Sequence, residues 1–412
     1  TAKERLRAMA RLWRLHGWAS LADRPLLEVG CGSGGNLLDL LRLGAYQLLR
    51  TRVEPHAALD TTVSAAKNEF DSVRGGFVNA VLRKISQRDE EMWADQLAPS
   101  IAQDPVGHLA FAYAHPRWIA EVFADALGGS IGSLQAALAA DDSRPPVHLV
   151  ARPGQITATE LALIAGGDEG RLSPYCVYLP GGDPGRLDVV REGLAGVQDE
   201  GSQLVAIALT RATLDGPDGG RWLDLCAGPG GKAALLGSLA ESSGAHLDAV
   251  EVSEHRADLI RSVTADLPVT VVVADGRDSG LEPGYDRVLV DAPCSGLGSL
   301  RRRPEARWRR RPSDVTELVP LQRELLTAAL DLVRPGGVVV YSTCSPHPAE
   351  TVGVVDAVCA ATGAEQLDAR PFVTTEGMEF PSPGDGPHVQ LWPHLHGTDA
   401  MFLAALRRPA DT

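Results

Sequence analysis

The chain has 412 residues, which is more than a single ordinary core holds and predicts two or three domains. Its hydrophobic content of 44% is typical of a globular protein, and its net charge of −14 argues at first against a nucleic-acid partner. No apolar run is long enough to cross a bilayer, and residues 1–18 lack the uninterrupted apolar core of a signal peptide.

The first third of the chain carries a helical pattern. Leucines at positions 37, 38, 41 and 48, with further leucines at 40, 43 and 49, give one broad apolar face at helical spacing. Residues 59–86 continue this pattern, so residues 37–85 predict an all-helical module. Residues 91–140 remain helical but are more acidic. A Pro/Arg-rich break at 141–154 leads to a short mixed segment that ends near residue 198.

From about residue 201, short apolar runs alternate with stretches of helical length. The runs are "RWLDL", "AHLDAV", "VTVVVAD", "DRVLVD" and "GGVVVYS". This alternation predicts a parallel sheet with crossover helices, and runs this apolar suit strands that are covered on both faces.

Glycines and acids follow the predicted strands in turn. The loop "CAGPGGK" follows the first strand and opens a helix, and its glycines let backbone approach a ligand closely. Glu251 ends the second strand and could accept hydrogen bonds from two ribose hydroxyls. Asp275 follows the third strand, where it could contact an adenine edge, and Asp291 ends the fourth. Successive strand ends meet at one crevice, so this order predicts a nucleoside site; a dehydrogenase site or a plain tight turn are the alternatives.

Two of the six cysteines, Cys294 and Cys344, also lie just past predicted strand ends and face the same crevice. Buried cysteines are usually inert, but a thiolate beside a nucleoside cofactor could serve as a nucleophile. Thiolate addition to carbon 6 of a pyrimidine would activate carbon 5 toward an electrophilic methyl group, and Asp291 near N3 would stabilise the adduct. The cysteines form no CxxC pair and no metal-ligand spacing, so we expect a reduced, cytoplasmic chain with no metal.

Positive charge is concentrated in two places. Residues 1–90 hold 14 Lys and Arg against 10 Asp and Glu, and seven arginines fall between positions 301 and 311. Binding to phosphates depends on the local patch, so these arginines are candidate nucleic-acid contacts; a solvated surface or pairing with acids is the alternative. The candidates are Arg301, Arg302, Arg303, Arg307, Arg309, Arg310 and Arg311.

Three motifs resemble a known family. "LCAGPGGK", "DAPCSGLGSLRRRPEARWR" and "YSTCSPHPAE" are similar to the S-adenosylmethionine loop, the Pro-Cys motif and the Thr-Cys motif of the NOL1/NOP2/Sun family of RNA 5-methylcytosine methyltransferases, in the same order. Residues 42–86 resemble the NusB-type helical RNA-binding domain of its bacterial RsmB (Sun/Fmu) branch. The resemblance covers about residues 40–412.

The resemblance implies a multidomain fold with an all-α NusB-like domain at 1–90, a helical linker and small α+β subdomain at 91–200, and a Rossmann-like class I methyltransferase domain at 201–412. Cys344 matches the nucleophile and Cys294 the cysteine that assists release of the methylated RNA, roles between which the residues alone could not choose. The implied partner is RNA, with small-subunit rRNA favoured, and the implied state is a monomer. The residues that match the cofactor-binding set are Cys226, Ala227, Gly228, Pro229, Gly230, Gly231, Lys232, Glu251, Asp275 and Asp291.

Residues 1–36 depart from the family's usual opening helices. "PLLEVGCGSGGNLLDLL" instead resembles a generic methyltransferase glycine loop, and Glu54 sits where a ribose-binding acid would. A second site would need further strands, but residues 55–150 supply only helical pattern. We therefore predict one cofactor site, at residues 226–232, and none at 30–35.

Two other functions fit parts of the sequence. One is a NusB-like RNA-binding or assembly factor whose methyltransferase domain is vestigial; the intact loop, acids and cysteines weigh against it. The other is a methyltransferase with another substrate, such as tRNA or protein, which only the NusB-like segment disfavours.

Overall fold

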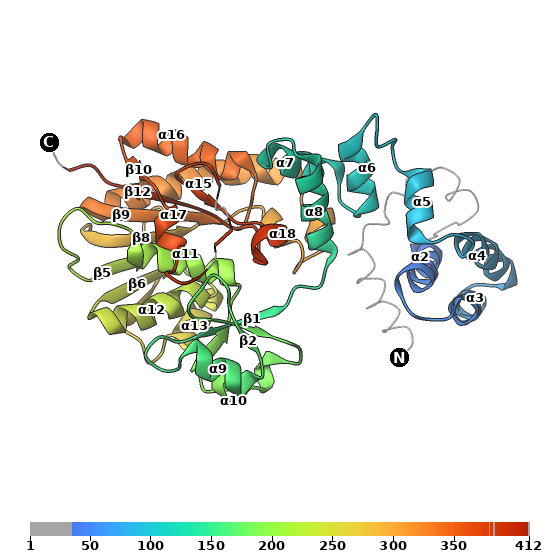
Figure 1. The fold of residues 1–412 in the computed structure, drawn as a ribbon, viewed down its shortest axis with the longest axis horizontal. Helices are drawn as coiled ribbons and strands as arrows, with labels where there is room; N and C mark the ends of the chain where they lie inside the picture. The colour runs from blue at the N-terminus through green and yellow to red at the C-terminus, as the bar shows by residue number, and fades with distance from the viewer. Residues whose placement is uncertain (1–34, 379, 382–383, 411–412) are drawn as a thin grey trace. The chain divides into compact units, whose positions relative to one another are not determined.

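The computed structural model describes residues 35–378, 380–381 and 384–410, which fall into two compact units (Figure 1). The first unit runs to Asp142 and also contains Arg303–Arg310. The second comprises Ser143–Arg302 and the chain from Arg311 onward. Helix α5 begins at Glu90 and α11 at Glu200, close to the predicted domain boundaries near 90 and 200, which remain a prediction.

The first unit is entirely helical over its described residues. Helices α2 and α4 pack around α3, with Leu37, Leu41, Val78 and Leu82 in their shared core. This confirms the predicted helical module. Asp71 caps α4 by accepting the backbone N–H of Arg74 at 2.8 Å, which satisfies a donor that the helix leaves unpaired. The helices are α2 (Gly35–Arg50), α3 (Pro55–Glu69), α4 (Ser72–Ile85), α5 (Glu90–Leu97), α6 (Pro105–Ala112), α7 (Arg117–Ala126), α8 (Ile131–Asp142) and α14 (Ala306–Arg309).

The second unit begins with a small antiparallel sheet in the order β2-β3-β1-β4. Leu149, Leu161 and Val177 form its core with the helices that cover it. This agrees with the predicted small α+β segment. Its elements are β1 (Val147–Ala151), α9 (Ala158–Ala165), β2 (Asp168–Glu169), β3 (Cys176–Leu179), η4 (Pro184–Arg186), α10 (Asp188–Arg191) and β4 (Ala195–Val197).

The larger sheet of this unit has eight strands in the order β10-β12-β9-β8-β5-β6-β7, with β11 paired to β12. Five of its strands are parallel, as predicted, and β7 forms one edge. These strands are β5 (Arg221–Asp224), β6 (His246–Glu251), β7 (Val269–Val273), β8 (Tyr285–Asp291) and β9 (Val333–Thr343). Three antiparallel strands that were not predicted complete one side: β10 (Glu365–Leu367), β11 (Val389–Gln390) and β12 (Phe402–Arg407).

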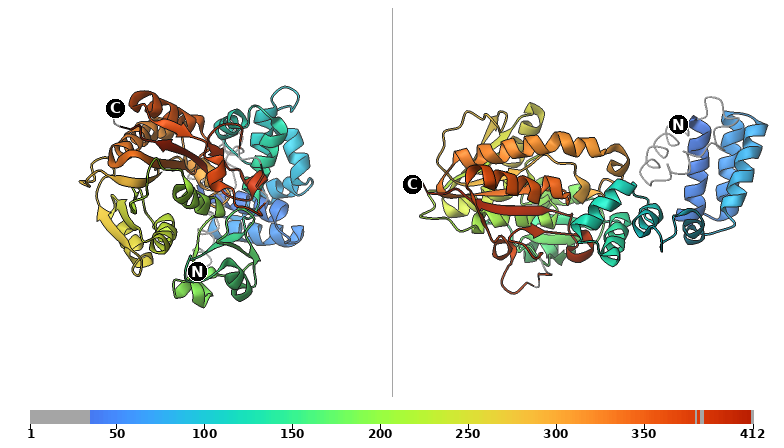
Figure 2. Two further views of the ribbon diagram at one scale, coloured as in Figure 1. Left: turned by 60° about the vertical axis from the view of Figure 1, so that its left-hand side comes forward. Right: turned by 90° about the horizontal axis from the view of Figure 1, so that it is seen from above.

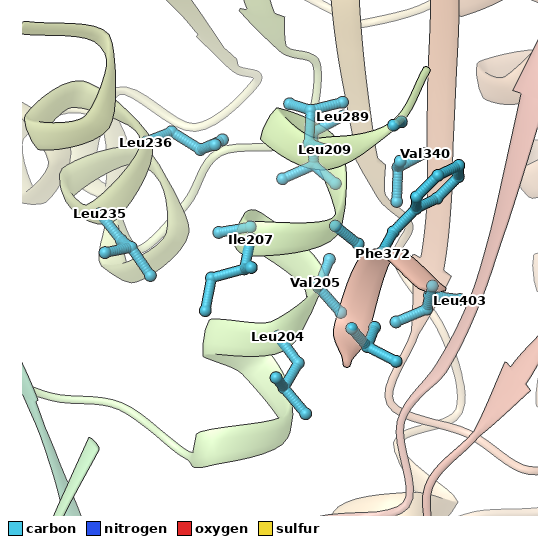
Figure 3. Close-up of a cluster of buried hydrophobic side chains, with 14 of the residues drawn as sticks. Leu204, Val205, Ile207, Leu209, Leu235, Leu236, Leu289, Val340, Phe372 and Leu403 are labelled. Atoms are coloured by element: carbon cyan, nitrogen blue, oxygen red, sulfur yellow. The ribbon is translucent and has the colours of Figure 1, made fainter. Parts of the chain in front are cut away.

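Helices cover both faces of the large sheet (Figures 1 and 2). Successive strand residues point to opposite faces, so β9 places Val340 in one core and Val339 and Tyr341 in the other. Figure 3 shows the first core, where α11 inserts Leu204 and Leu209 beside α12 and the sheet. The helices of this domain are α11 (Glu200–Arg211), α12 (Gly231–Ser243), α13 (Glu254–Val263), η5 (Leu297–Ser299), α15 (Pro312–Leu332), η6 (Pro348–Glu350), α16 (Val352–Thr362), α17 (Arg370–Val373) and α18 (Pro393–His396). None of the described helices is long and apolar enough to span a membrane.

Candidate active site

The parallel strands bring the predicted site residues to one edge of the large sheet. The glycine loop follows β5, Glu251 ends β6, Asp291 ends β8, and Cys344 follows β9. Neighbouring parallel strands end on the same side, so residues from 226 to 344 converge where doubly wound sheets bind ligands.

The glycine loop leaves no room for side chains. A Cβ on Gly228 would lie 2.1 Å from Oε2 of Glu251, and one on Gly230 would lie 2.7 Å from Cγ2 of Val263. Gly230 also has a φ of +111°, a region that other residues rarely adopt. Helix α12 then starts at Gly231, so its first N–H groups face the end of the loop.

Glu251 holds this loop in place. It is 4% exposed, and its carboxylate accepts the backbone N–H of Gly228 at 3.1 Å and that of Ser253 at 2.9 Å. Arg256 lies 3.4 Å from Oε2 of Glu251 and also donates to the carbonyl of Gly228. Glu251 is therefore joined to the glycine loop, and its contact with ribose hydroxyls remains a prediction.

Asp224 lies directly before the glycine loop and is not among the residues that the sequence predicted for the site. It ends β5 fully buried, and Oδ2 has no hydrogen-bond partner among the described residues. Burial, with the nearby charge of Asp291, raises the pKa of Asp224 to about 7. The signal was present in "RWLDL", where an acid interrupts an apolar strand immediately before the glycine loop.

Lys232 and Asp291 form a partly buried ion pair, with Nζ 2.8 Å from Oδ2. The hydroxyl of Ser342 donates to Oδ1 of Asp291 at 2.9 Å. Burial alone would lower the pKa of Lys232, but the charge and hydrogen bond of Asp291 raise it above its ordinary value. The lysine is thus a fixed positive charge at this edge of the sheet.

Asp275, which follows β7, forms a separate ion pair with Arg277. Its half-exposed carboxylate accepts hydrogen bonds from the side chain of Arg277, and those bonds lower the pKa of Asp275 to about 2. The thiol of Cys226 packs against the same apolar core as Val272 and Leu281. Burial raises the pKa of this thiol. The backbone of Cys226, rather than its sulfur, belongs to the loop, with its N–H 3.4 Å from Oδ1 of Asp224.

The two cysteines that follow β8 and β9 are in direct contact. The Sγ atoms of Cys294 and Cys344 are 3.4 Å apart, and both thiols are free. The N–H of Gly298 donates to the carbonyl of Cys344 at 2.9 Å, which ties the loop after β8 to the loop after β9. The geometry therefore brings together the thiol pair that the sequence predicted.

The environments of the two sulfurs differ. The hydrogen bond from Cys294, together with the charge of Lys232, lowers the pKa of Cys344 against the opposing effect of burial. That same hydrogen bond, burial and the charges of Glu350 and Asp291 raise the pKa of Cys294. Cys344 is accordingly the thiol that ionises more readily.

Three of the seven arginines that were predicted to bind RNA pair with acidic residues of the protein, the alternative that the sequence left open. Arg301 and Arg302 each pair with both Asp199 and Asp399, at N–O distances of 2.6–3.1 Å. The fully buried Arg307 pairs with Asp142 at 2.6 Å. Burying an arginine requires a partnered charge, so these three side chains are committed to acids that lie far away in the sequence.

The remaining four arginines of the run are placed differently. Arg303, Arg309 and Arg311 are exposed, and Arg310 is partly exposed.

The glycine-rich stretch at residues 30–34, for which no cofactor site was predicted, lies outside the described residues. Among the described residues, no group of three or more His, Cys, Asp or Glu side chains is arranged to hold a metal ion.

Family models match both parts of the chain. The model described as 16S rRNA methyltransferase RsmB/F matches residues 211–407, and that of the NusB family matches residues 35–87. A protein of Mycobacterium tuberculosis (strain ATCC 25618 / H37Rv) is 63% identical over 374 residues, which cover 90% of this chain and 80% of that protein. Ribosomal RNA small subunit methyltransferase B of Pectobacterium atrosepticum is 33% identical over 396 residues, which cover 91% of this chain and 83% of the relative. The chain belongs to the RsmB/F methyltransferase family.

Solved structures share the fold of this RsmB/F family member. The crystal structure of PH0851 has a TM-score of 0.74 at 22% identity and covers 97% of this chain and 88% of its own. The structure of NSun6 from Pyrococcus horikoshii with SFG has a TM-score of 0.61 at 19% identity and covers 72% of this chain and 99% of its own. These likenesses support the multidomain fold with a Rossmann-like methyltransferase domain.

Proposed function

We propose that this family member is an S-adenosylmethionine-dependent RNA cytosine-C5 methyltransferase that acts on small-subunit ribosomal RNA. The observation that carries the proposal is the contact between Cys294 and Cys344 at the edge of the sheet that also bears the glycine loop and Asp291. The rRNA substrate is supported by the names of the relatives, and free thiols in a site that needs them reduced suit the cytoplasm.

The residues present fit S-adenosylmethionine. The side-chain-free loop at Gly228 and Gly230 allows close backbone approach, and Glu251 offers carboxylate oxygens for ribose hydroxyls. The unpartnered Oδ2 of buried Asp224 suits an ammonium group. When bound, this molecule supplies an electrophilic methyl group. The neighbouring NSun6 structure, which contains SFG, supports a ligand in this class of domain.

Glu251→Gln is expected to weaken S-adenosylmethionine binding by at least about tenfold for each ribose hydrogen bond lost. Glu254→Gln, an exposed glutamate at the start of the following helix, is the matched control and should bind normally. Calorimetric titration without RNA measures both affinities and the stoichiometry. Unchanged binding by Glu251→Gln would contradict the placement of the ribose, and two molecules bound per chain would contradict a single site.

The proposed reaction begins at Cys344. Its thiolate adds to carbon 6 of cytosine, and the electron pair of the 5,6 double bond moves so that carbon 5 becomes nucleophilic. In its protonated form the Asp291 carboxyl, which Lys232 contacts, donates its proton to N3 of the base as negative charge develops there, and it takes that proton back when the base is released. Carbon 5 then takes up the methyl group as the bond between that group and its sulfur breaks.

Release reverses the addition. A base removes the proton from carbon 5, the electron pair restores the 5,6 double bond, and the bond between carbon 6 and Cys344 breaks. Cys294 assists this step because its S–H lies within hydrogen-bonding reach of the departing sulfur and can stabilise the thiolate that forms. The cytosine must be single-stranded or flipped out of its helix to reach these thiols.

RNA binding is proposed for the arginines that are not buried. Replacing Arg303, Arg309 and Arg311 together by glutamine should flatten the plot of log affinity against log salt by about 2, since each phosphate contact contributes about 0.7. The matched control replaces three other exposed arginines, Arg186, Arg261 and Arg370. The control removes the same total charge, so equal slopes for the two triple variants would contradict a specific role for this run.

The substrate is tested by bisulfite sequencing of total RNA from a strain that lacks the gene. The proposal predicts the loss of one or more 5-methylcytosines from small-subunit rRNA and their return with the wild-type gene. Loss from tRNA alone would establish the tRNA alternative. An unchanged methylation pattern together with no S-adenosylmethionine binding would favour the assembly factor.

A further inference from the structure

A buried glutamate is hydrogen-bonded to the two loops that carry the cysteines. Glu350 ends the short helix η6, six residues after Cys344, and is 0% exposed. Its carboxylate makes no hydrogen bond to either sulfur, and the proposed reaction gives it no chemical step. A carboxylate in such a position needs hydrogen-bond donors to offset its loss of water.

Those donors come from the loops that carry the cysteines. Oε1 of Glu350 accepts the backbone N–H of Ser295 at 2.7 Å, and Oε2 accepts the hydroxyl of Ser345 at 2.6 Å and also that of Ser295. Ser295 directly follows Cys294, and Ser345 directly follows Cys344. One carboxylate therefore holds the residues next to both thiols.

A third segment joins the same carboxylate. The side-chain amide of Gln322, buried on α15, donates to Oε1 of Glu350 at 3.1 Å and to the carbonyl of Pro293 at 2.9 Å. Pro293 directly precedes Cys294, so the cysteine is held on both sides. The four donors match the acceptor capacity of an ionised carboxylate, which no neutral side chain reproduces.

We propose that Glu350 is a positioning residue that holds the loops at 292–296 and 344–347 at the separation that the thiol pair needs. This inference rests on the proposed function for its catalytic consequence. A glutamine at this position would offer an NH₂ group to two of the four donors, so half of the hydrogen bonds would be lost and the loops would separate. The hydrogen bond between Cys294 and Cys344 would weaken as a result.

Glu350→Gln is the test, with Asp286→Asn as the matched control. Asp286 is a buried carboxylate, 3% exposed, at the opposite end of β8, where it accepts hydrogen bonds from Arg221 and Arg334. Both variants lose a buried carboxylate, and only one loses the link between the cysteine loops. Glu350→Gln should lower kcat by about a hundredfold while KM for S-adenosylmethionine stays within about twofold of wild type.

A second readout needs neither RNA nor methyl donor. The rate of Cys344 alkylation by iodoacetamide, followed across pH by mass spectrometry, reports how readily that thiol ionises. Loss of the hydrogen bond from Cys294 should move the midpoint for Cys344 to higher pH in Glu350→Gln and leave it unchanged in Asp286→Asn. Simple removal of a negative charge would move the midpoint to lower pH instead.

An unchanged or lowered midpoint in Glu350→Gln, with kcat equal to that of Asp286→Asn, would overturn the proposal. If Glu350→Gln does not fold, Ser345→Ala and Ser295→Ala each remove one donor and should shift the midpoint upward by a smaller amount; no shift in either would equally overturn it. Failure of the wild-type protein to methylate any RNA would contradict the proposed function. The pH dependence of Cys344 alkylation would still test whether Glu350 positions the two cysteine loops.

Discussion

Cys344→Ala is expected to abolish methyl transfer, with a loss in kcat on the order of 10⁴-fold or more, as for other catalytic nucleophiles. Without the Cys344 sulfur, carbon 6 has no partner and carbon 5 stays a poor nucleophile. The variant should bind S-adenosylmethionine as well as wild type, because the glycine loop and Glu251 hold that site independently. Transfer of labelled methyl groups to rRNA measures the loss.

Cys294→Ala should behave differently. It leaves the Cys344 thiol free to attack but removes the S–H that stabilises the departing thiolate, so methylated RNA should remain attached to the protein. A slow band on a denaturing gel would report the complex. Near-normal turnover by both variants would mean that the cysteines are structural. A slow band from Cys344→Ala alone would mean that Cys294 is the nucleophile and Cys344 assists release.

Asp291→Asn is expected to lower kcat by about 10²–10³-fold, the loss seen when one group that stabilises developing charge is removed. The asparagine keeps the shape of the side chain but has no acidic proton to give to N3, and it also removes the charge that Lys232 pairs with at 2.8 Å. Lys232 would then keep its charge without its partner, and that charge would still lower the pKa of Cys344. Initial rates at saturating RNA and methyl donor measure the effect.

Asp248→Asn is the control for that variant. Asp248 lies in the same sheet, has a similar exposure to Asp291 and also accepts a hydroxyl hydrogen bond, from Tyr285 at 2.6 Å. It is remote from the carboxyl end of β8, so its replacement should cost stability and not kcat. Equal losses in kcat for the two variants would contradict a role for Asp291 in the reaction.

Much of the fold follows from local pattern. The apolar runs became β5 to β9, and leucine spacing identified the first helices. Strands β5, β6, β8 and β9 are largely buried, whereas β7, at the edge of the sheet, is partly exposed. Strand β12 was missed as a strand because "FLAALR" carries no alternation that distinguishes it from a buried helix. Its strand conformation depends on pairing with β9, a contact across about sixty residues of sequence, which local pattern does not contain.

The candidate site likewise contains some residues that local sequence pattern predicts and others that it does not. Residues at strand ends could be predicted, since topology alone brings Glu251, Asp291 and Cys344 to one edge. Glu350 could not be, because its role arises only when η6 folds beneath both cysteine loops. The acidic partners of Arg301 and Arg307 could not be predicted for a related reason: they lie about a hundred residues or more away in sequence.

The attachment point of the RNA tests the account most directly. Cys294→Ala protein is incubated with substrate RNA and S-adenosylmethionine, denatured and digested, and the peptide that carries a methylated cytosine is sequenced by mass spectrometry. The account predicts a bond between Cys344 and carbon 6 of that base. Attachment at any other residue, or no attachment from a variant that still methylates RNA, would contradict it.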